Sequence, residues 1–505
     1  MNVLEVDGEH LTAAGLEEVV REGRPVRLAE AARQRMLRSR RAIEEMLHRG
    51  TAVYGVNTGF GRLAEVAIPP EELRQLQQNL LRSHAAGVGP ALGREEVRAL
   101  LLLRANALAR GHSGVRPEVV ELLLGMLNAG VHPRVPEQGS VGASGDLAPL
   151  AHAALVLVGE GEAEVDGQLL PGGEALRRAG LEPIALEAKE GLALINGTQL
   201  MEAVGLLAWM GAERLMEWAD AVGALSLQAL RGIPDPFRAE LQALRPHPGQ
   251  IRSAARLRAY LEGSRLTTAP GELRVQDAYS LRCMPQVHGA SRDALEYVGR
   301  VLETEINAVT DNPLVFADPP EAISGGNFHG QPLALALDLL AIAVAELGDI
   351  SERRTERLLN PQSSGLPPFL ARNGGVESGL MLIQYTQAAL VSENKTLAHP
   401  ASVDSIPTSA GQEDHVSMGA WAARKARRVV GNVALVLAAE AMAAAAAADL
   451  RGPEELAPAS SAVYRRIRAV VPPLRGDRSP AAELERLAAL LLRETPPGAE
   501  IPASA

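Results

Sequence analysis

Helical periodicity constrains the fold of this 505-residue chain more than any other feature. Apolar residues recur at three- and four-residue spacing along most of the sequence, which is typical of the buried face of an α-helix. The clearest such segments end at Gly or in a Gly- or Pro-rich loop, as helices commonly do; they are residues 70–85, 93–111, 116–130 and 330–359. Strand-like alternation is scarce. We therefore predict a mainly α fold.

The predicted helices differ in length along the chain, which indicates two parts. Up to about residue 200 they are short and interrupted by Gly/Pro loops, and GEAEVDGQLL at 161–170 is the best candidate for a small β-hairpin. Beyond it they are long and rich in Ala and Leu. We expect a smaller mixed N-terminal domain at 1–200 and an elongated helical bundle core at 201–505. No internal repeat is visible.

Charge and cysteine content exclude several classes of protein. The chain has 61 acidic and 50 basic residues, a net charge of −11, so no basic face for nucleic acid is indicated. One cysteine, Cys283, excludes an internal disulfide framework and a cysteine-based zinc cluster. The first residues, MNVLEVDGEHLT, lack the pattern of a signal peptide. We expect a cytoplasmic protein.

The longest apolar segment, VALVLAAEAMAAAAAADL at 433–450, could be taken for a membrane span. It carries Glu440 near its middle, and alanine drives membrane insertion only weakly. A buried helix of the bundle is the better interpretation, so no membrane is expected as a partner.

The stretch GSVGASGDLAPLAH at 139–152 places three glycines, three residues apart, directly before an apolar run. A dinucleotide loop needs G-x-G-x-x-G and a P-loop needs a lysine, so neither fits. The serine elbow G-x-S-x-G does not fit either. One interpretation is a tight turn that caps a helix, with Asp146 as N-cap and Pro149 in the first turn. It leaves the small size of Ala143, Ser144 and Gly145 unexplained.

A second interpretation is chemical. Glycine permits a tight backbone bend and leaves its amide nitrogen unhindered. The nitrogen of Gly145 could then attack the carbonyl of Ala143, and loss of water would close a five-membered ring. Loss of the Ser144 hydroxyl would leave an exocyclic alkene, which makes the product, a methylidene-imidazolone, an electrophile built from the backbone alone.

Aromatic residues make up only 3% of the chain, yet four of them lie in loops rich in Gly, Asn or Gln. They are Tyr54, Phe60, Tyr279 and Phe328. Because sites are often built from loops on a rigid scaffold, a shared pocket is a more economical explanation than scattered surface aromatics.

The chain resembles the aromatic amino acid ammonia-lyase family. The stretch at 139–152 is similar to the family's cofactor signature, and seven further motifs follow in family order and cover most of the chain. They are YGVNTGFG (54–61), SHAAGVG (83–89), EGLALINGTQ (190–199), VQDAYSLRCMPQVHGA (275–290), TDNPLV (310–315), SGGNFHG (324–330) and SAGQEDHVSMG (409–419).

The resemblance implies roles for individual residues. It places a methylidene-imidazolone cofactor, formed autocatalytically, at Ala143, Ser144 and Gly145, with no metal and no pyridoxal phosphate. It puts Tyr54 in the position of the base that removes the β-proton, although Glu413 stays open as an alternative. The remaining implied contacts are Arg282 as carboxylate clamp, Asn196, Gln276 and Tyr279 as polar lining, and Phe328 as an apolar wall. Taken alone, each of these side chains could equally be a packing or loop hydrogen-bonding residue.

Two positions match the branch of the family that acts on histidine. His84 follows Ser83, and Glu413 stands where phenylalanine-specific members have an amide. The ring nitrogens of an imidazole substrate need partners, which a carboxylate and a histidine supply. A phenyl ring would leave both groups buried and unpaired, at a cost of about 1–3 kcal/mol each.

We therefore expect elimination of ammonia from L-histidine to give trans-urocanate, the first step of histidine degradation. The resemblance also implies a homotetramer built on the helical core, with active sites shared between subunits. A phenylalanine or tyrosine ammonia-lyase, or an aminomutase with the same cofactor, is the nearest alternative. A pyridoxal-phosphate lyase would need a Schiff-base lysine, and none of Lys189, Lys395 and Lys425 is next to a phosphate-type loop. A non-catalytic helical scaffold is the third alternative.

Overall fold

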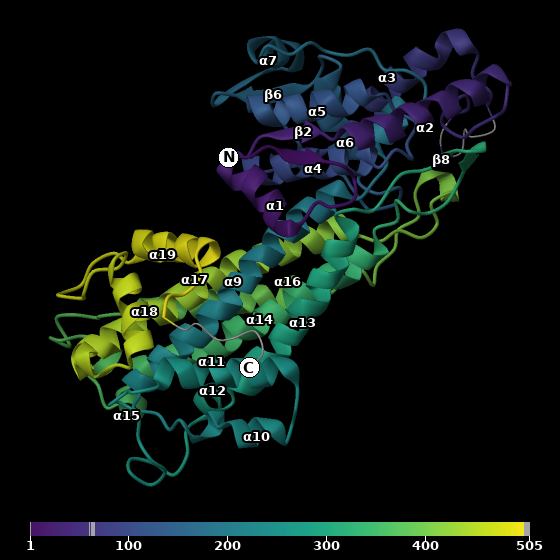
Figure 1. Ribbon diagram of the computed structural model, residues 1–505. Coiled ribbons are helices and arrows are strands. Elements are labelled where there is room, and N and C mark those ends of the chain that lie inside the picture. The colour runs from purple at the N-terminus through teal and green to yellow at the C-terminus, as the bar shows by residue number, and fades with distance from the viewer. Residues whose placement is uncertain (1, 60, 62–65, 499–505) are drawn as a thin grey trace. The chain divides into compact units, whose positions relative to one another are not determined.

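The computed structural model describes residues 2–59, 61 and 66–498, whose course is shown in Figure 1. Phe60 therefore lies outside the described residues. The chain forms two compact units, each assembled from three segments. Unit 1 comprises Met1–Leu207, Arg300–Leu337 and Ala401–Arg424. Unit 2 comprises Ala208–Gly299, Asp338–Pro400 and Lys425–Ala505.

These units interleave along the chain, whereas the sequence predicted two contiguous domains at 1–200 and 201–505. The segments 300–337 and 401–424 belong with the N-terminal part because they pack against it rather than within unit 2. Periodicity along the chain gives the type of each element but not its packing partners. The division into domains at 1–200 and 201–505 stays a prediction.

Unit 1 is a mixed α and β structure, as expected for the N-terminal part. Its helices are α1 (Ala13–Glu17), the π-helix η1 (Glu18–Glu22), α2 (Glu30–His48), the 3₁₀-helices η3 (Pro70–Glu72) and η6 (Ser409–Gly411), α3 (Leu73–His84), α4 (Arg94–Ala109), α5 (Pro117–Ala129), α6 (Leu147–Leu157), α7 (Gly172–Arg178) and α8 (Glu190–Ile195). Its strands are β1 (Leu4–Val6), β2 (Val26–Leu28), β3 (Val88–Ala91), β4 (His132–Pro133), β5 (Pro136–Gln138), β6 (Glu162–Val165), β7 (Gln168–Pro171), β8 (Leu314–Ala317) and β9 (Pro320–Ile323).

The strands of unit 1 form only small sheets. The pair β1 and β2 is parallel, β3 pairs with β5, β4 joins β6 and β7, and β8 pairs with β9, the last three sheets being antiparallel. The predicted hairpin at 161–170 is confirmed as β6 and β7. Asp166 and Gly167 connect its strands, and both have the positive φ that a two-residue hairpin turn favours.

Helix α4 is buried along almost its whole length. Every residue from Glu96 to Ala109 is buried, including Arg98 and Arg104. A helix that is apolar almost all round is buried on all sides, so a charged side chain on it needs partners within the protein.

Unit 2 is built from helices, whose course can be followed in Figure 1. Those confined to it are η4 (Asp235–Phe237), α10 (Ala239–Ala243), α11 (Pro248–Leu261), α12 (Tyr279–Arg282), α15 (Pro361–Ser364), η5 (Pro368–Leu370), α16 (Met381–Leu397), η7 (Pro453–Glu455), α18 (Pro458–Arg468) and α19 (Ala481–Arg493). Four long helices have residues in both units: α9 (Gln199–Ala229), α13 (Met284–Glu305), α14 (Gln331–Leu359) and α17 (Gly419–Arg451). The predicted mainly α fold with a bundle of long helices is confirmed.

Glycines let the long helices of unit 2 approach one another closely. A Cβ on Gly299 of α13 would lie 2.6 Å from the ring of Trp209 on α9. A Cβ on Gly223 of α9 would lie 2.6 Å from the sulfur of Met284 on α13. A larger residue at either position would force the facing side chain to shift, so each glycine lets the two helices pack closely.

The most apolar helix, α17, is a core helix of the bundle. It is long and apolar enough to cross a membrane, yet 89% of its most apolar window is buried within the protein. Glu440 in that window accepts two hydrogen bonds from Arg354 of α14, at 2.6 and 2.8 Å, and one from Ser226 of α9 at 2.7 Å. The interpretation of 433–450 as a buried bundle helix is confirmed.

Candidate active site

The loop between β5 and α6 is held in a conformation that requires glycine. Gly139, Gly142 and Gly145 all have φ values in the positive range. A Cβ on Gly145 would overlap the backbone carbonyl of Gly197, with which Gly145 forms a parallel bridge. The two backbones are therefore in direct contact, which only glycine allows.

Asp146 locks this loop to the start of α9. Its carboxylate accepts hydrogen bonds from the Ser140 hydroxyl at 2.7 Å and from the amides of Leu200 and Met201 at 3.0 and 2.9 Å. Asp146 stands at the N-cap position of α6, as the sequence predicted, but its side chain makes no cap bond to that helix. The prediction that the Asp146 side chain caps α6 is therefore wrong, because the carboxylate binds the first amides of α9 instead. Complete burial raises the pKa of Asp146 to about 6, although the hydrogen bonds oppose the shift.

Ser144 is held from two sides by distant parts of unit 1. Its hydroxyl donates to Glu413 Oε1 at 3.0 Å, and its carbonyl accepts the side-chain Nδ2 of Asn196 at 2.8 Å. The other oxygen of Glu413 accepts the hydroxyl of Thr408 at 2.6 Å. The structure thus brings together Ala143, Ser144, Gly145, Asn196 and Glu413, as the sequence predicted.

His84 lies at the end of α3, close enough to Glu413 for the two charges to interact. Burial lowers the pKa of His84, and the negative charge of Glu413 acts in the opposite direction. The ring nitrogen Nδ1 lies 3.0 Å from the Ser83 hydroxyl. The His84 imidazole is therefore within electrostatic range of Glu413, the residue that contacts Ser144.

The Tyr54 loop adjoins the Glu413 loop. The hydroxyl of Tyr54 accepts the amide of Gly61 at 3.1 Å. A Cβ on Gly61 would meet the Ser409 hydroxyl, which places Gly61 against the segment that carries Glu413. Tyr54 is thereby near this site, half-buried in its turn.

Phe328 is half-buried in the loop before α14. The next residue, His329, stacks on His415 with ring centroids 5.8 Å apart, and its Nε2 lies 3.3 Å from the His415 carbonyl. His415 is two residues from Glu413 in the sequence. The Phe328 loop therefore lies against the segment that carries Glu413.

The other three predicted residues, Gln276, Tyr279 and Arg282, belong to unit 2. The Arg282 guanidinium stacks on the Tyr279 ring, 4.6 Å from its centroid, and 70% of Tyr279 is exposed. Gln276 and Arg282 line a cavity of about 310 Å³ within unit 2, together with Asp277, Cys283 and Gln286. Nε of Arg282 and Oε1 of Gln286 are buried there without a hydrogen-bond partner among the described residues. Arg282 gives the wall of this cavity a cationic side chain.

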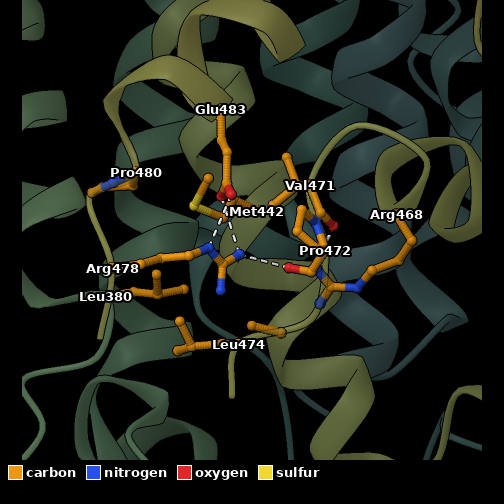
Figure 2. A pocket seen from close by; sticks show the side chains of 10 residues that line it. Leu380, Met442, Arg468, Val471, Pro472, Leu474, Arg478, Pro480 and Glu483 are labelled. Atoms are coloured by element: carbon orange, nitrogen blue, oxygen red, sulfur yellow. Dashed lines mark hydrogen bonds and ion pairs between the residues drawn. The ribbon is translucent and has the colours of Figure 1, made fainter. Parts of the chain in front are cut away.

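A second cavity in unit 2 has no room for a substrate. Its volume is about 10 Å³, roughly that of one water molecule. Figure 2 shows Arg478 placed between the carboxylate of Glu483, at 2.9 Å, and the carbonyl of Pro472, at 2.6 Å. Among the described residues, no three His, Cys, Asp or Glu side chains are grouped so that they could hold a metal ion.

The model of the aromatic amino acid lyase family matches residues 11–469 of the chain. The chain belongs to the aromatic amino acid lyase family. Membership of this family makes it an ammonia-lyase, and similar curated proteins are ammonia-lyases as well. The histidine ammonia-lyase of Symbiobacterium thermophilum is 60% identical over 96% of each chain.

Solved structures of the family share the fold across different activities. The histidine ammonia-lyase of Trypanosoma cruzi has a TM-score of 0.90 at 46% identity and covers 97% of this chain and 93% of its own. The tyrosine aminomutase of Streptomyces globisporus has a TM-score of 0.93 at 41% identity over 97% of each chain. Because two different reactions occur on the same lyase fold, the fold does not choose between them.

Sequence reasoning missed three residues that hold the site of this lyase. Thr408 orients Glu413, Ser140 binds Asp146, and Arg104 lies behind the Asn196 turn, donating to the Asn196 carbonyl at 3.2 Å. Ser140 was inside a motif already singled out. Arg104 carried a weaker signal, namely a charge in the middle of an apolar helix.

Proposed function

We propose that this protein eliminates ammonia from L-histidine to give trans-urocanate. The observation that carries the proposal is the contact of Glu413 with Ser144 at 3.0 Å, with His84 close to the same carboxylate. An imidazole ring placed there has a hydrogen-bond partner for each nitrogen. A phenyl ring offers a hydrogen-bond partner to neither of these side chains, and a phenol offers only one hydroxyl.

The proposal includes a cofactor made from Ala143, Ser144 and Gly145. The amide nitrogen of Gly145 bonds to the carbonyl carbon of Ala143, and the carbonyl oxygen leaves as water with the amide protons of Gly145 and Ser144. Ser144 then loses its hydroxyl and its α-proton as a second water. The close backbone approach of Gly145 and Gly197 supports this, because it keeps a side chain away from the nitrogen that must react. The resulting alkene supplies an electrophile that converts the substrate amine into a better leaving group.

Asn196 has a defined task in this chemistry. When the α-proton of Ser144 is removed, negative charge develops on the Ser144 carbonyl oxygen. Nδ2 of Asn196 donates to that oxygen at 2.8 Å, so a donor is in place where the charge develops. We assign Asn196 to charge stabilisation on these grounds.

For the elimination itself, we assign removal of the β-proton to Tyr54 or Glu413. Both are in unit 1, and Glu413 is the one seen in contact with the loop. We assign Arg282 to the substrate carboxylate, because a guanidinium matches a carboxylate with two hydrogen bonds. Gln276 and Tyr279 complete the polar lining and Phe328 an apolar wall.

We further propose a cytoplasmic homotetramer with active sites shared between subunits. The 70% exposure of Tyr279 supports sharing, because an exposed binding residue is available to another copy of the chain. Light scattering after size exclusion should then give four times the 53.4 kDa of one chain. A monomer would contradict the proposal.

The decisive experiment offers the purified protein L-histidine, L-phenylalanine and L-tyrosine in parallel, with ultraviolet absorbance and ammonia followed together. The expected result is an absorbance rise with histidine alone, matched by ammonia. A rise with another substrate would refute the substrate assignment but keep the cofactor. A β-amino acid without net ammonia would indicate an aminomutase.

An intact-mass measurement separates the enzyme from a non-catalytic scaffold. Loss of two waters lowers the mass by about 36 Da, and the loss should map to the peptide that contains 143–145. An unchanged mass in folded protein would refute the cofactor. The Ser144→Ala variant is the control, because it cannot lose the second water.

A further inference from the structure

The turn at Asn196 and Gly197 makes the contacts that hold the loop, and it is clamped from behind. On its front side Asn196 binds the Ser144 carbonyl, and the Gly197 carbonyl accepts the amide of Asp146 at 2.7 Å. On its rear side a Cβ on Gly197 would overlap Nη1 of Arg104. The turn therefore has no room to retreat from the loop.

Arg104 is the rear wall of this turn. It extends from α4, is 2% exposed, and donates Nη1 to the Asn196 carbonyl at 3.2 Å and to Gln199 Oε1 at 2.7 Å. Gln199 in turn donates to the Thr310 hydroxyl at 2.8 Å. These bonds connect the turn to α4 and to the segment at Thr310, so the guanidinium fixes the turn from two directions.

Keeping a cation at this position is costly. Nε and Nη2 of Arg104 are buried with no hydrogen-bond partner among the described residues. Burial lowers the pKa of Arg104 to about 10, with Asp311 and Glu202 opposing the shift, so the side chain stays charged at neutral pH. If the position only filled space, an apolar residue of similar volume would be less costly there. This cost indicates that the charged side chain of Arg104 has a function beyond filling space.

We propose that Arg104 is a positioning residue for cofactor formation: it holds the Asn196–Gly197 turn so that the Ser144 carbonyl and the Gly145–Asp146 peptide stay in register for ring closure. The inference rests on the proposed function, because it concerns closure of the same ring. Arg104 acts through Asn196 and Gly197, whose atoms contact the reacting residues.

The test compares Arg104→Lys with Arg98→Lys. Arg98 is a matched control because it lies on the same helix, is also buried, and donates to the carbonyls of Val19, Val20 and Leu127 rather than to the turn. A lysine retains the charge at either position but cannot form the same set of hydrogen bonds. Circular dichroism shows whether each variant folds. Intact mass gives the fraction of protein that has closed the ring. The rate of ammonia release is then divided by that fraction to give the turnover per closed ring.

We expect Arg98→Lys to close the ring completely, even if it melts earlier. Folded Arg104→Lys should close less than half of its rings, and each closed ring should turn over at least tenfold more slowly than in Arg98→Lys. Complete closure with turnover within twofold of the control would overturn the inference. A smaller effect on both measures would also overturn it, since general loosening of the helix would then account for it.

If Arg104→Lys does not fold, Gln199→Leu decides, because it removes the acceptor that orients the guanidinium and leaves the charge in place. Incomplete closure in that variant supports the positioning role, and complete closure overturns it. The mass of the wild-type protein distinguishes failure of the proposed cofactor from failure of the proposed role of Arg104. A wild-type chain without the mass loss would refute the cofactor itself, whereas a closed wild-type ring together with closed variants refutes only the role of Arg104.

Discussion

Replacing Gly145 by alanine tests the packing of the loop between β5 and α6 most directly. The glycine has a φ of +73°, and an added Cβ would overlap the carbonyl and carbon of Gly197, both of them backbone atoms. Backbone cannot swing aside as the end of a flexible side chain can. Gly167→Ala is the matched control, because this glycine has a φ of +76° but nothing within 4 Å of the added atom.

The two substitutions differ by the clash alone. Both place alanine in the left-handed region, at a cost of about 1–2 kcal/mol. Only Gly145→Ala also forces the Gly145 loop away from Gly197, which breaks the 2.7 Å bond between the Gly197 carbonyl and the Asp146 amide. Leaving these buried groups unpaired costs about 1–3 kcal/mol more. The loop in Gly145→Ala should therefore open roughly 5- to 150-fold more often than expected from the conformational cost alone, which Gly167→Ala measures.

Hydrogen exchange measured by mass spectrometry reads this out. Both changes are made in the Ser144→Ala background, so that ring chemistry does not contribute. The peptide that covers 139–157 should exchange faster in Gly145→Ala, while the hairpin peptide over β6 and β7 reports the conformational cost alone in Gly167→Ala. Equal acceleration of the two local peptides would refute the argument, because strain at positive φ would then explain everything.

Four further outcomes are expected. Glu413→Gln should raise KM for L-histidine roughly 10- to 150-fold, the value of a hydrogen bond to a charged group, while the loop still loses about 36 Da; an unchanged KM would remove Glu413 from ring binding. Tyr54→Phe should lower kcat by about 10²–10⁴ with KM within a few-fold if Tyr54 is the base, and unchanged kcat would leave Glu413 as the base. Arg282→Lys should raise KM and leave kcat less affected, because lysine lacks the fork that matches a carboxylate; loss of kcat alone would contradict the clamp. Burial and two neighbouring arginines lower the pKa of His132 to about 4. The folded state therefore favours the neutral ring, so its stability contribution is present above pH 6.5 and is lost as the pH falls toward 4. His132→Gln should flatten this loss in urea midpoints measured from pH 7 to 4, and parallel curves would contradict it.

Local sequence was sufficient for most elements of the fold. The predicted segments at 70–85, 93–111, 116–130 and 330–359 contain α3, α4, α5 and α14, because apolar spacing and terminal Gly or Pro are local properties. The Asp166-Gly167 turn was equally readable, since few residue pairs accept positive φ twice in succession. Assignment of segments to units was not readable, because the segment at 401–424 joins unit 1 through contacts with residues far away in sequence.

The sequence by itself determined the types of most elements and the order of the motifs on which the proposed site rests. Small residues at 143–145 and the surrounding motifs indicated the site without any coordinates. Only the tertiary structure decided how these residues are held. Ser144 and Glu413 are 269 positions apart, Asp146 caps α9 rather than its own helix, and Arg104 reaches the Asn196 turn from α4. The physical reason is that a motif records residue types and their order, whereas hydrogen bonds and buried charges depend on which distant backbones fold into contact.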